Sequence, residues 1–324
     1  TLTHKPFEEL TDDEIVAHLH VQDAERVFCV YEALKRGIDH ETIWKITKID
    51  WWFLDKMQHL ADLEKGLAKC NGVLSLEQYQ TAKKYGFQDK TIKRLAQVDV
   101  LPVENYRAGF KMVDTCAAEF SANTPYFYST YDGDNEAAEF IAAREAEAAA
   151  NGQPKKKKVL VFGSGPIRIG QGIEFDYCSV HCVWTLKNHG CEAILVNNNP
   201  ETVSTDFDTG DRLYFDPLNP ESVDNIIATE KPDACVVQFG GQTAIKLAKH
   251  MDEIGLPILG TPADAIDEAE DRERFDELLE RCKIPRAPGR TVFNLEEALA
   301  AADEIGLPVL MRPSYAVSYT HLTL

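Results

Sequence analysis

The first hundred residues place apolar side chains at the three- and four-residue spacing of amphipathic helices. One such run consists of Ala24, Val27, Phe28, Tyr31 and Leu34, with Gly37 as a stop. A second run opens at Asp50 and carries Phe53, Leu54, Met57, Leu60 and Ala61 on one stripe. The β-branched runs of four to eight residues that are typical of strands do not occur in residues 1–97. We therefore expect this part of the chain to be a helical unit.

Capping signals mark where several of these helices begin. Thr11 and Glu14 have the Thr-x-x-Glu spacing of a capping box, and Ser75 and Gln78 have the related Ser-x-x-Gln spacing. Asp89 precedes another short apolar stripe and is expected to cap it. In each case a side-chain oxygen can accept from backbone N–H groups that the first helical turn leaves unpaired.

Residues 98–157 are expected to connect this helical unit to a second domain. The first part of the segment is rich in Pro, Asn and Tyr, and its aromatic side chains would be costly to leave in water. These aromatic residues are Tyr126, Phe127, Tyr128 and Tyr131. A connector laid over a neighbouring domain is favoured over a site that stacks nucleobases. Residues 136–150, rich in Ala and Glu, predict a surface helix that ends at Asn151 and Gly152.

From Lys158 onward, short apolar runs alternate with helical patterns. The expected strands are residues 159–162, 193–196, 234–237 and 257–259, followed by a last strand at residues 309–311. Helical segments separate most of them. Strands that alternate with helices form right-handed crossovers, which predicts a parallel sheet covered on both faces.

A glycine-rich turn follows the first of these strands and precedes a helix. Its glycines are Gly163, Gly165, Gly170 and Gly172. Glycines at such a place permit a tight turn and let backbone N–H groups approach an anion. The spacing is not the Gly-x-Gly-x-x-Gly of dinucleotide sites, and the Lys-Ser/Thr of a phosphate-binding P-loop is missing. Two interpretations stay open: an anion-facing turn, or a purely structural turn in a Rossmann-like sheet.

Asparagines stand at the end of the second expected strand, at Asn197, Asn198 and Asn199. Nicotinamide sites carry a carboxylate there to bind the ribose diol, so the sequence disfavours a dehydrogenase. The polar loops at residues 197–206 and 238–243 follow carboxyl ends of strands, where open α/β sheets bind ligands. Ordinary turn chemistry is the alternative for both loops.

Composition and charge narrow the class of protein. The chain has 324 residues, 44% hydrophobic and 27% charged, which is typical of a soluble globular protein of about two domains. Its formal charge of −19 repels nucleic acid, and the short basic run at residues 155–158 is read as a solvated linker. No apolar stretch reaches the ~18 residues that span a bilayer, so we expect no membrane partner.

The eight cysteines are scattered, which indicates reduced thiols and a cytoplasmic location. Cys178, His181 and Cys182 share one face of an expected helix, but a structural zinc site needs four ligands and no second pair complements these three. We therefore expect no metal site within the chain.

Two arginines are candidate phosphate ligands. Arg272 lies in the first turn of an expected helix, where the helix dipole disfavours a cation, and Arg312 ends the last expected strand. A guanidinium group binds phosphate oxygens through paired N–H donors and does not lose its charge. The alternative for each is a solvated surface arginine.

Several ordered motifs resemble the large chain of carbamoyl phosphate synthetase. They are Gly163-Ser-Gly-Pro-Ile-Arg-Ile-Gly-Gln-Gly-Ile-Glu-Phe-Asp-Tyr-Cys178, Asn199-Pro-Glu-Thr-Val-Ser-Thr-Asp206, Val237-Gln-Phe-Gly-Gly-Gln-Thr243, Ala269-Glu-Asp-Arg-Glu-Arg-Phe275 and Arg312-Pro-Ser-Tyr315. Val113-Asp-Thr-Cys-Ala-Ala-Glu-Phe120 and Tyr128-Ser-Thr-Tyr131 fit the same family. The similarity runs from near the start of the chain to Tyr315.

This resemblance implies an α plus α/β fold in a defined order. Residues 1–97 would be the C-terminal part of a helical oligomerisation domain, and residues 98–157 the connector. Residues 158–262 would form a Rossmann-like, parallel-sheet pre-ATP-grasp domain, and residues 263–315 the start of a truncated ATP-grasp domain. Residues 316–324 look foreign to the family, and we expect them to be a disordered, non-native tail.

The resemblance also implies a function for the parent protein. That protein would be an ATP-dependent carbon–nitrogen ligase of pyrimidine and arginine biosynthesis, and this chain would belong to the half that phosphorylates carbamate. By resemblance, Arg312 and Arg272 contact ATP, the turn from Gly163 to Gly172 faces the carbamate path, and the Mg²⁺ ligands lie beyond the chain. The implied partners are bicarbonate and carbamate, a glutaminase chain or domain that supplies ammonia, and further copies bound through residues 1–97.

The chain itself is expected to be a fragment, because it starts at Thr1 and does not end like a finished domain. It is expected to be inactive, because it has few of the metal-binding and cationic groups on which phosphoryl transfer depends. A non-catalytic assembly module is therefore one alternative function. Another ATP-grasp ligase, such as a biotin carboxylase, is a second alternative, which the upstream helical unit argues against.

Overall fold

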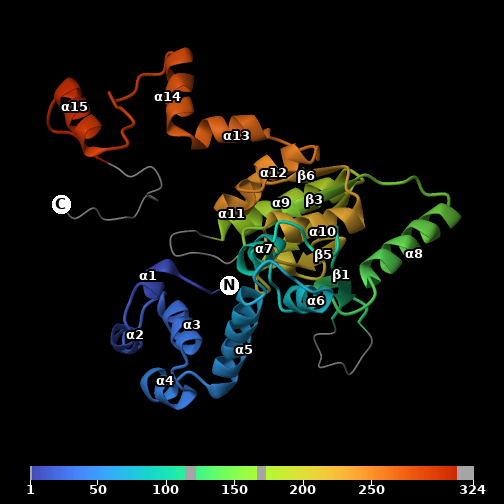
Figure 1. Ribbon diagram of the computed structural model, residues 1–324. Helices are drawn as coiled ribbons and strands as arrows, with labels where there is room; N and C mark the ends of the chain where they lie inside the picture. Colours follow the sequence, from blue (N-terminus) through green and yellow to red (C-terminus); the bar gives the residue numbers. More distant parts are fainter. Residues whose placement is uncertain (1, 114–121, 166–172, 312–324) are drawn as a thin grey trace. The chain divides into compact units, whose positions relative to one another are not determined.

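The computed structural model describes residues 2–113, 122–165 and 173–311, and these form two compact units (Figure 1). The first unit comprises residues 1–147 together with 221–229, and the second comprises residues 148–220 and 230–324. Two helices cross the division between the units, α8 (Glu136–Ala150) and α10 (Pro220–Glu230).

The first unit begins with seven consecutive helices. They are α1 (Lys5–Glu8), α2 (Asp12–His18), α3 (Arg26–Arg36), α4 (His40–Thr47), α5 (Trp51–Ala68), α6 (Leu76–Lys84) and α7 (Asp89–Ala96). Both expected capping boxes are present, at Thr11 before α2 and at Ser75 before α6. Gly37 ends α3 in the left-handed conformation, as a glycine stop should. The expected helical unit is confirmed.

Two details of this unit differ from expectation. Asp89 is the first residue of α7 rather than its cap, because its carboxylate instead pairs with the Lys83 ammonium group at 2.9 Å. Phe53 lies outside the buried stripe of α5, since Leu54 occupies the inward position and consecutive helical residues point about 100° apart.

Two apolar clusters form the core of the helices. The first joins α1 to the start of α5, and its buried members include Phe7, Ile15, Leu34, Ile43 and Leu54. The second joins the end of α5 to α6 and α7 through Leu67, Tyr79, Ala82, Phe87 and Ile92. The long helix α5 therefore contributes to both clusters and links them.

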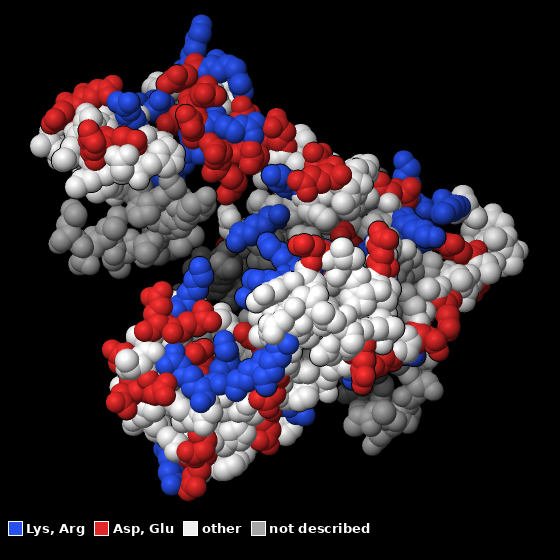
Figure 2. Space-filling model, in the orientation of Figure 1, with Lys and Arg blue, Asp and Glu red and all other residues white. Residues whose placement is uncertain are grey.

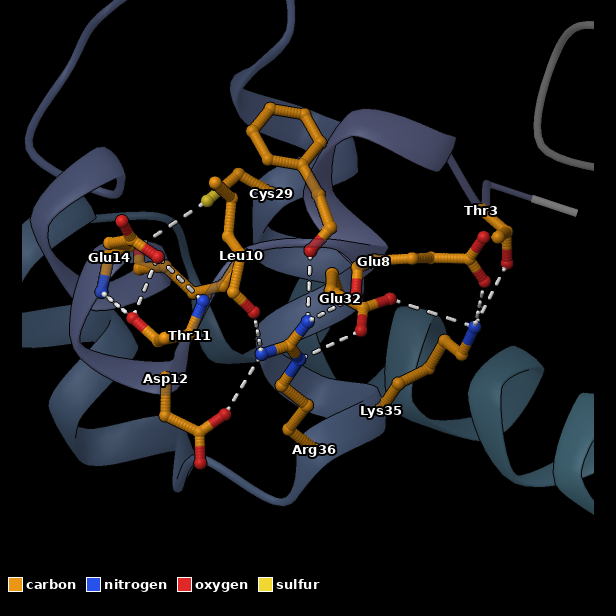
Figure 3. Close-up of polar contacts among 12 residues, drawn as sticks. Thr3, Glu8, Leu10, Thr11, Asp12, Glu14, Cys29, Glu32, Lys35 and Arg36 are labelled. Carbon is orange, nitrogen blue, oxygen red and sulfur yellow. Dashed lines mark hydrogen bonds and ion pairs between the residues drawn. The ribbon is translucent and has the colours of Figure 1, made fainter.

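Arg36 fixes the chain before α3 through backbone carbonyl groups (Figure 3). Its guanidinium donates to the carbonyl oxygens of Leu10 at 2.6 Å and Phe7 at 2.9 Å, and to the Glu32 carboxylate at 2.8 Å. These contacts raise the pKa of Arg36 above its usual value, with the Glu32 hydrogen bond as the first cause. Arg36 thereby ties the segment around α1 to α3 through the carbonyl groups of Phe7 and Leu10.

The connector contains two strands that sequence analysis did not predict. Strands β1 (Gly109–Met112) and β2 (Tyr126–Thr130) pair antiparallel, with Phe110 opposite Ser129. Both runs are short and mixed in polarity, so neither has the apolar alternation that identifies a strand. The first part of the connector thus forms an antiparallel pair of strands. The surface helix expected in its second part is present as α8.

The second unit contains a parallel sheet. Its strands are β3 (Lys158–Phe162), β4 (Glu192–Asn197), β5 (Arg212–Phe215) and β6 (Ala234–Val236), in the order β5-β4-β3-β6. The central pair aligns Leu160 with Ile194, and β3 also pairs with β6 through Leu160 and Cys235. Helix α9 (Glu174–Asn188) packs against β3 and β4. Buried apolar side chains fill β3 and β4, as a sheet covered on both faces requires.

Short helices complete the second unit. They are η1 (Val203–Thr205), η2 (Gln238–Gly240), α11 (Gly241–Ile245), α12 (Ala248–Glu253), α13 (Ala263–Glu270), α14 (Arg272–Arg281) and α15 (Leu295–Ile305). Acidic and basic side chains are interspersed over α13–α15 (Figure 2). Ion pairs such as Arg281 with Glu268 at 2.6 Å and Arg290 with Glu304 at 2.6 Å account for part of this pattern.

The strand predictions for this unit need three corrections. Strand β5 was missed, because its first residue is a charged arginine, Arg212, that nevertheless lies buried. Residues 309–311 were expected to be a strand but have no regular structure, since strand geometry needs a hydrogen-bonded neighbour and the described residues supply none there. Residues 257–259 form a single parallel bridge, from Ile258 to Cys235, rather than a full strand.

The fold class is confirmed: a helical unit is followed along the chain by a Rossmann-like parallel sheet and then by further helices. In the described residues, no helix has the length and apolar character needed to cross a membrane. The expected tail, residues 316–324, lies outside the described residues.

Candidate functional site

The strand order defines one special position on the parallel sheet. Chain order runs β3, β4, β5 toward one side, and the next strand, β6, then pairs with β3 on its other side. The direction of winding therefore reverses between β3 and β6. Open α/β sheets bind ligands at such a switch point, at the carboxyl ends of the strands. The turn after β3 and the turn after β6 are accordingly the candidate site.

Asn197, the last residue of β4, holds the turn after β3 in place. Its side chain is fully buried, and its Oδ1 accepts hydrogen bonds from the backbone N–H of Gly165 at 3.0 Å and of Asn199 at 3.2 Å. Its Nδ2 donates to the hydroxyl of Ser204 at 3.4 Å. Both ends of the amide are thus used within the protein, so Asn197 acts as a brace for the turn and not as a ribose ligand.

Gly163 and Gly165 are required by this arrangement. A β-carbon on Gly163 would lie 2.5 Å from Nδ2 of Asn197. Gly165 has φ of +69°, which L-residues rarely adopt, and a β-carbon there would lie 2.8 Å from Oδ1 of Asn198. The glycines therefore let the asparagines approach the backbone closely. Gly170 and Gly172, also predicted for this turn, lie outside the described residues.

The turn after β6 closes against the turn after β3. A β-carbon on Gly240 would lie 2.5 Å from the carbonyl oxygen of Gly163 and 2.6 Å from that of Phe162. Only a residue without a side chain fits this approach. The two turns that flank the switch point are therefore in direct contact.

Helix α9 adds a buried carboxylate beside these turns. Asp176 is 1% exposed, and its Oδ2 accepts a hydrogen bond from the backbone N–H of Ser204 at 3.0 Å. Its other oxygen, Oδ1, is buried and has no hydrogen-bond partner in the part of the chain that the structure describes. Asp176 and Asn197 together fix η1, the segment that follows β4.

Of the two arginines predicted to bind phosphate, only Arg272 lies within the described residues. Arg272 is the first residue of α14, as expected, and is half-buried. The side chain of Asp271 caps this helix by accepting from the backbone N–H of Arg274 at 2.9 Å. Arg312 lies outside the described residues, so the structure does not bring the two arginines together or separate them.

The neighbouring Arg274 has acidic partners on α13. Its guanidinium pairs with Asp264 at 2.7 Å and also contacts Asp267. These hydrogen bonds hold the pKa of Arg274 above its usual value. Arg274 therefore ties α14 to α13.

Among the described residues, no further metal ligands lie beside Cys178, His181 and Cys182 on α9. Burial raises the pKa of the Cys182 thiol to about 11, which disfavours the thiolate that binds metals. The His181 ring meets the rings of Tyr177 and Trp184 edge to face, with centroid distances of 4.6 and 5.5 Å. Across residues 2–113, 122–165 and 173–311, no three His, Cys, Asp or Glu side chains are grouped so that they could hold a metal ion.

Sequence analysis identified the glycine turn but not the residues that brace it. The sequence predicts Asn197 as a replacement for an acid and as the start of a polar loop, but does not single out Asp176 or Ser204. Asp176 could have been found, because it lies in the first turn of α9 on the buried face, beside Val180 and Val183. An acidic residue among buried apolar positions usually has a specific partner.

Three family models match consecutive parts of the chain. Residues 1–111 match the oligomerisation domain of the carbamoyl-phosphate synthetase large chain. Residues 155–268 match the preATP-grasp domain of carbamoyl phosphate synthase, and residues 271–318 match the ATP binding domain of its L chain.

Curated relatives agree with these matches. Carbamoyl phosphate synthase large chain from Lachnoclostridium phytofermentans is 53% identical over 312 residues, which are 94% of this chain and 28% of the relative. The corresponding protein from Agathobacter rectalis is 52% identical and covers 96% of this chain and 28% of its own length. The archaeal protein from Archaeoglobus fulgidus is 46% identical over 320 residues. The chain thus spans a little over a quarter of the length of these relatives.

Solved structures show weaker likeness. The biotin carboxylase domain of a single-chain bacterial carboxylase has a TM-score of 0.34 and 17% identity, covering 46% of this chain and 34% of that one. Rhizobium etli pyruvate carboxylase T882A with acetyl coenzyme-A has a TM-score of 0.36 and 14% identity, covering 48% and 14%. The sequence matches alone carry the assignment: this chain belongs to the family of carbamoyl phosphate synthase large chains.

Proposed function

We propose that this chain is the part of a carbamoyl phosphate synthase large chain that joins the oligomerisation domain to the half that phosphorylates carbamate. The order of the three family matches carries the proposal, because an oligomerisation domain precedes a preATP-grasp and an ATP-binding domain. The helical first unit and the parallel sheet of the second unit are consistent with that order.

The same order supports a domain assignment, whose proposed bounds differ from the matched ranges 1–111, 155–268 and 271–318. Residues 1–97 form the oligomerisation domain, residues 98–157 the connector and residues 158–262 the preATP-grasp domain. Residues 263–315 begin the ATP-grasp domain, and residues 316–324 are a non-native tail.

The proposed reaction is a phosphoryl transfer from ATP to carbamate. A carbamate oxygen attacks the γ-phosphorus, the bond from that phosphorus to the β,γ-bridging oxygen breaks, and ADP leaves with carbamoyl phosphate as the other product. Such transfers depend mainly on positioning and on neutralising phosphate charge. Carbamate decomposes in water, so the parent must shield it. The turn from Gly163 to Gly172, at the switch point of the sheet, is the proposed wall of that path.

ATP binding is assigned to two arginines. Arg272 and Arg312 hold phosphate oxygens of the nucleotide through charge-assisted hydrogen bonds. The ATP is used with Mg²⁺, which neutralises phosphate charge when bound. By resemblance to the family, the ligands of that ion are proposed to lie in the parent beyond this chain.

The proposed partners follow from the family. A small glutaminase chain or domain supplies ammonia, bicarbonate and carbamate are small substrates, and residues 1–97 bind further copies of the chain. The parent acts in the cytoplasm, in pyrimidine and arginine biosynthesis. The chain alone has few of the phosphoryl-transfer groups, so it is expected to release no ADP from ATP and carbamate. For this chain in isolation, assembly is then the remaining function.

The test is made in the full-length parent with Arg272→Ala and Arg312→Ala. Two partial reactions are measured: ATP synthesis from carbamoyl phosphate and ADP, and ATP hydrolysis with bicarbonate alone. Hydrogen bonds to charged groups contribute about 1.5–3 kcal/mol each, so the first reaction should fall roughly 10–100-fold. Bicarbonate-dependent hydrolysis should survive. Lysine should restore activity only in part, because a point charge does not reproduce the planar guanidinium.

Arg274→Ala is the matched control, because Arg274 lies two residues from Arg272 on the same helix, pairs with Asp264 and is not assigned to the nucleotide. It should leave both reactions near the wild-type rate. Equal loss of both reactions in the Arg272 or Arg312 variant would contradict the assignment, and so would the absence of any loss.

A further inference from the structure

Helix α10 lies late in the chain, after strand β5, yet most of it belongs to the first unit. Residues 221–229 group with the helices of the first unit, whereas Pro220 and Glu230 group with the second unit. One continuous helix thus contributes to both units. The contacts at its two ends decide whether α10 ties the stability of one unit to that of the other.

The first turn of α10 completes a buried ion pair of the helical unit. Lys83, in α6, is 2% exposed, and its ammonium group contacts the Glu221 carboxylate and lies 2.9 Å from that of Asp89. The same group lies over the ring of Tyr131, 5.0 Å from the ring centre. Burial alone would lower the pKa of Lys83, but its hydrogen bonds to Glu221 and Asp89 raise that pKa above the ordinary value. A buried ammonium group that stays charged needs its acid partners, and α10 supplies one of them.

Helix α10 also supplies acceptors to backbone groups of the first unit. The second oxygen of Glu221 accepts a hydrogen bond from the backbone N–H of Asp89, the first residue of α7, at 2.8 Å. It thereby caps a helix whose own cap residue, Gln88, makes no side-chain cap bond. Further along α10, the buried Asn225 accepts from the backbone N–H of Ala108 at 3.4 Å. The first unit is therefore completed by residues that come more than a hundred positions later in the chain.

The last residue of α10 is held just as firmly in the second unit. The Glu230 side chain is fully buried, and its two oxygens accept from the Arg212 guanidinium at 2.7 and 2.9 Å. Tyr214 donates its hydroxyl to the same carboxylate at 2.6 Å. Both Arg212 and Tyr214 lie on β5. Each end of α10 thus carries a carboxylate that neutralises a buried cation, one in each unit.

From these contacts we infer that α10 is a coupling helix, through which the two units unfold as one cooperative structure. Helix formation is cooperative along the chain, so an opening that releases Glu221 from Lys83 also weakens the hold of Glu230 on Arg212. Each unit therefore owes part of its stability to the other. A ligand that binds only the second unit should accordingly protect the helices of the first unit as well.

Two buried cysteines can report the opening of each unit in one sample. Cys29 lies in the core of the first unit and Cys235 on β6 of the second, and both are fully buried. The whole chain is labelled with a short pulse of maleimide at increasing urea concentrations, and peptide mass spectrometry gives the labelled fraction at each thiol. In the wild-type chain the two thiols should have the same urea midpoint. Separate midpoints there would overturn the inference.

Ala228→Pro interrupts α10 without removing a buried side chain. Ala228 is exposed, and proline there removes a helical hydrogen bond and clashes with the carbonyl of the preceding turn. The midpoints of Cys29 and Cys235 should separate in this variant. Ala143→Pro is the matched control, because Ala143 is exposed on α8, the other helix that crosses the division, and its midpoints should stay together. Coincident midpoints in Ala228→Pro, or an equal separation in Ala143→Pro, would overturn α10 as the coupling helix.

Glu221→Gln keeps α10 intact but removes an acid partner of Lys83. In urea just below the transition, labelling should quicken roughly tenfold or more at both cysteines, because a hydrogen bond between charged groups is lost. Glu41→Gln is the matched control, since the partner of Glu41 is the exposed Lys45, and it should leave both labelling rates unchanged. Faster labelling at Cys29 alone would overturn the coupling. This variant also carries the test if circular dichroism shows that the proline variant does not fold.

Discussion

The two edges of the parallel sheet in the second unit are built from different chemistry. At the carboxyl edge, glycines and the amide of Asn197 bring the turns after β3 and β6 together. At the amino edge, Arg212 at the start of β5 is buried between two carboxylates, Glu230 and Glu192. The carboxyl edge is shaped by close backbone approach, with the buried carboxylate of Asp176 beside it, and the amino edge is held by a network of paired charges.

The amino edge is a closed network. Arg212 donates from Nε and Nη2 to the two oxygens of Glu230, at 2.7 and 2.9 Å, and Tyr214 donates its hydroxyl to the same carboxylate at 2.6 Å. Lys158 also donates to the backbone carbonyl of Glu230, at 3.2 Å. Every charge in this network has a partner of opposite sign or a hydrogen bond, which is what burial demands.

The two edges of the sheet should therefore differ in how well they tolerate substitutions. A buried charge network is costly to break but offers no free donor to a ligand. The glycine turn is instead shaped by close backbone approach, with the N–H groups of Gly163 and Gly165 bonded to Val196 and Asn197, and it lies at the switch point where such sheets bind ligands. Stability is therefore concentrated at the amino edge, and the function proposed for this unit at the carboxyl edge.

The largest expected effect comes from Arg212→Met. Removing the guanidinium leaves the Glu230 carboxylate buried without its cation, which should lower the free energy of unfolding by about 3–5 kcal/mol. Urea denaturation measures the loss. Replacing Arg212 and Glu230 together by Met should cost less than Arg212→Met alone, because no unpaired charge remains. A double variant less stable than the single one would contradict this account of the network.

Gly240→Ala should have the largest effect at the carboxyl edge. The new β-carbon would overlap the carbonyl oxygens of Gly163 and Phe162, and the turns must separate, at a cost of about 1–3 kcal/mol. Gly66→Ala is the control, because Gly66 lies within α5 with no atom near the added carbon. It should stabilise the chain by about 0.5–1 kcal/mol. Equal melting temperatures for the two variants would refute the close approach.

Asn197→Ala removes the brace rather than adding bulk. The backbone N–H groups of Gly165 and Asn199 lose their acceptor, which should cost about 1–3 kcal/mol. Asn198→Ala, at an exposed neighbouring position, should change stability by no more than about 0.5 kcal/mol. Hydrogen exchange should also quicken at Gly165 in the Asn197 variant. Unchanged exchange there would show that the amide does not hold the turn.

Much of this organisation could be predicted from sequence, because its determinants are local. Each of these signals depends on residues that are close together in sequence. Examples are the capping boxes at Thr11 and Ser75, the glycine stop at Gly37 and the alternation of apolar runs with helical patterns. The glycine turn itself could also be predicted from sequence. Its two interpretations, an anion-facing turn and a structural turn, depend on the hydrogen bond between Gly165 and Asn197, which the sequence does not show.

The features that sequence analysis missed depend on distant partners. Arg212 belongs to a strand only because Glu230 and Glu192 neutralise it across the sheet. Residues 309–311 have the apolar pattern of a strand but no neighbour in the described chain. Phe53 fits a helical stripe by spacing, yet it is exposed because its neighbour Leu54 takes the buried position.

The smallest expected effect concerns Tyr214 and pH. Burial raises the pKa of the Tyr214 hydroxyl above its ordinary value, and the adjacent Glu230 carboxylate adds to this rise. The folded state then holds the proton more tightly than the unfolded state. The resulting stability is fully present below pH of about 10 and is lost as the pH rises above that value. Tyr214→Phe should cost about 1 kcal/mol at pH 7 and flatten the alkaline fall in stability. An identical alkaline slope in both proteins would contradict this assignment.

The contrast between the two edges is tested most directly in the full-length parent. Gly165→Ala disturbs the carboxyl edge, because Gly165 has φ of +69° and Asn198 occupies the space beside it. Glu192→Gln disturbs the amino edge at its most exposed carboxylate. ATP synthesis from carbamoyl phosphate and ADP should fall tenfold or more in the first variant and stay near the wild-type rate in the second, with bicarbonate-dependent hydrolysis retained in both. Full synthesis in Gly165→Ala, or an equal loss in Glu192→Gln, would contradict the placement of function at the carboxyl edge.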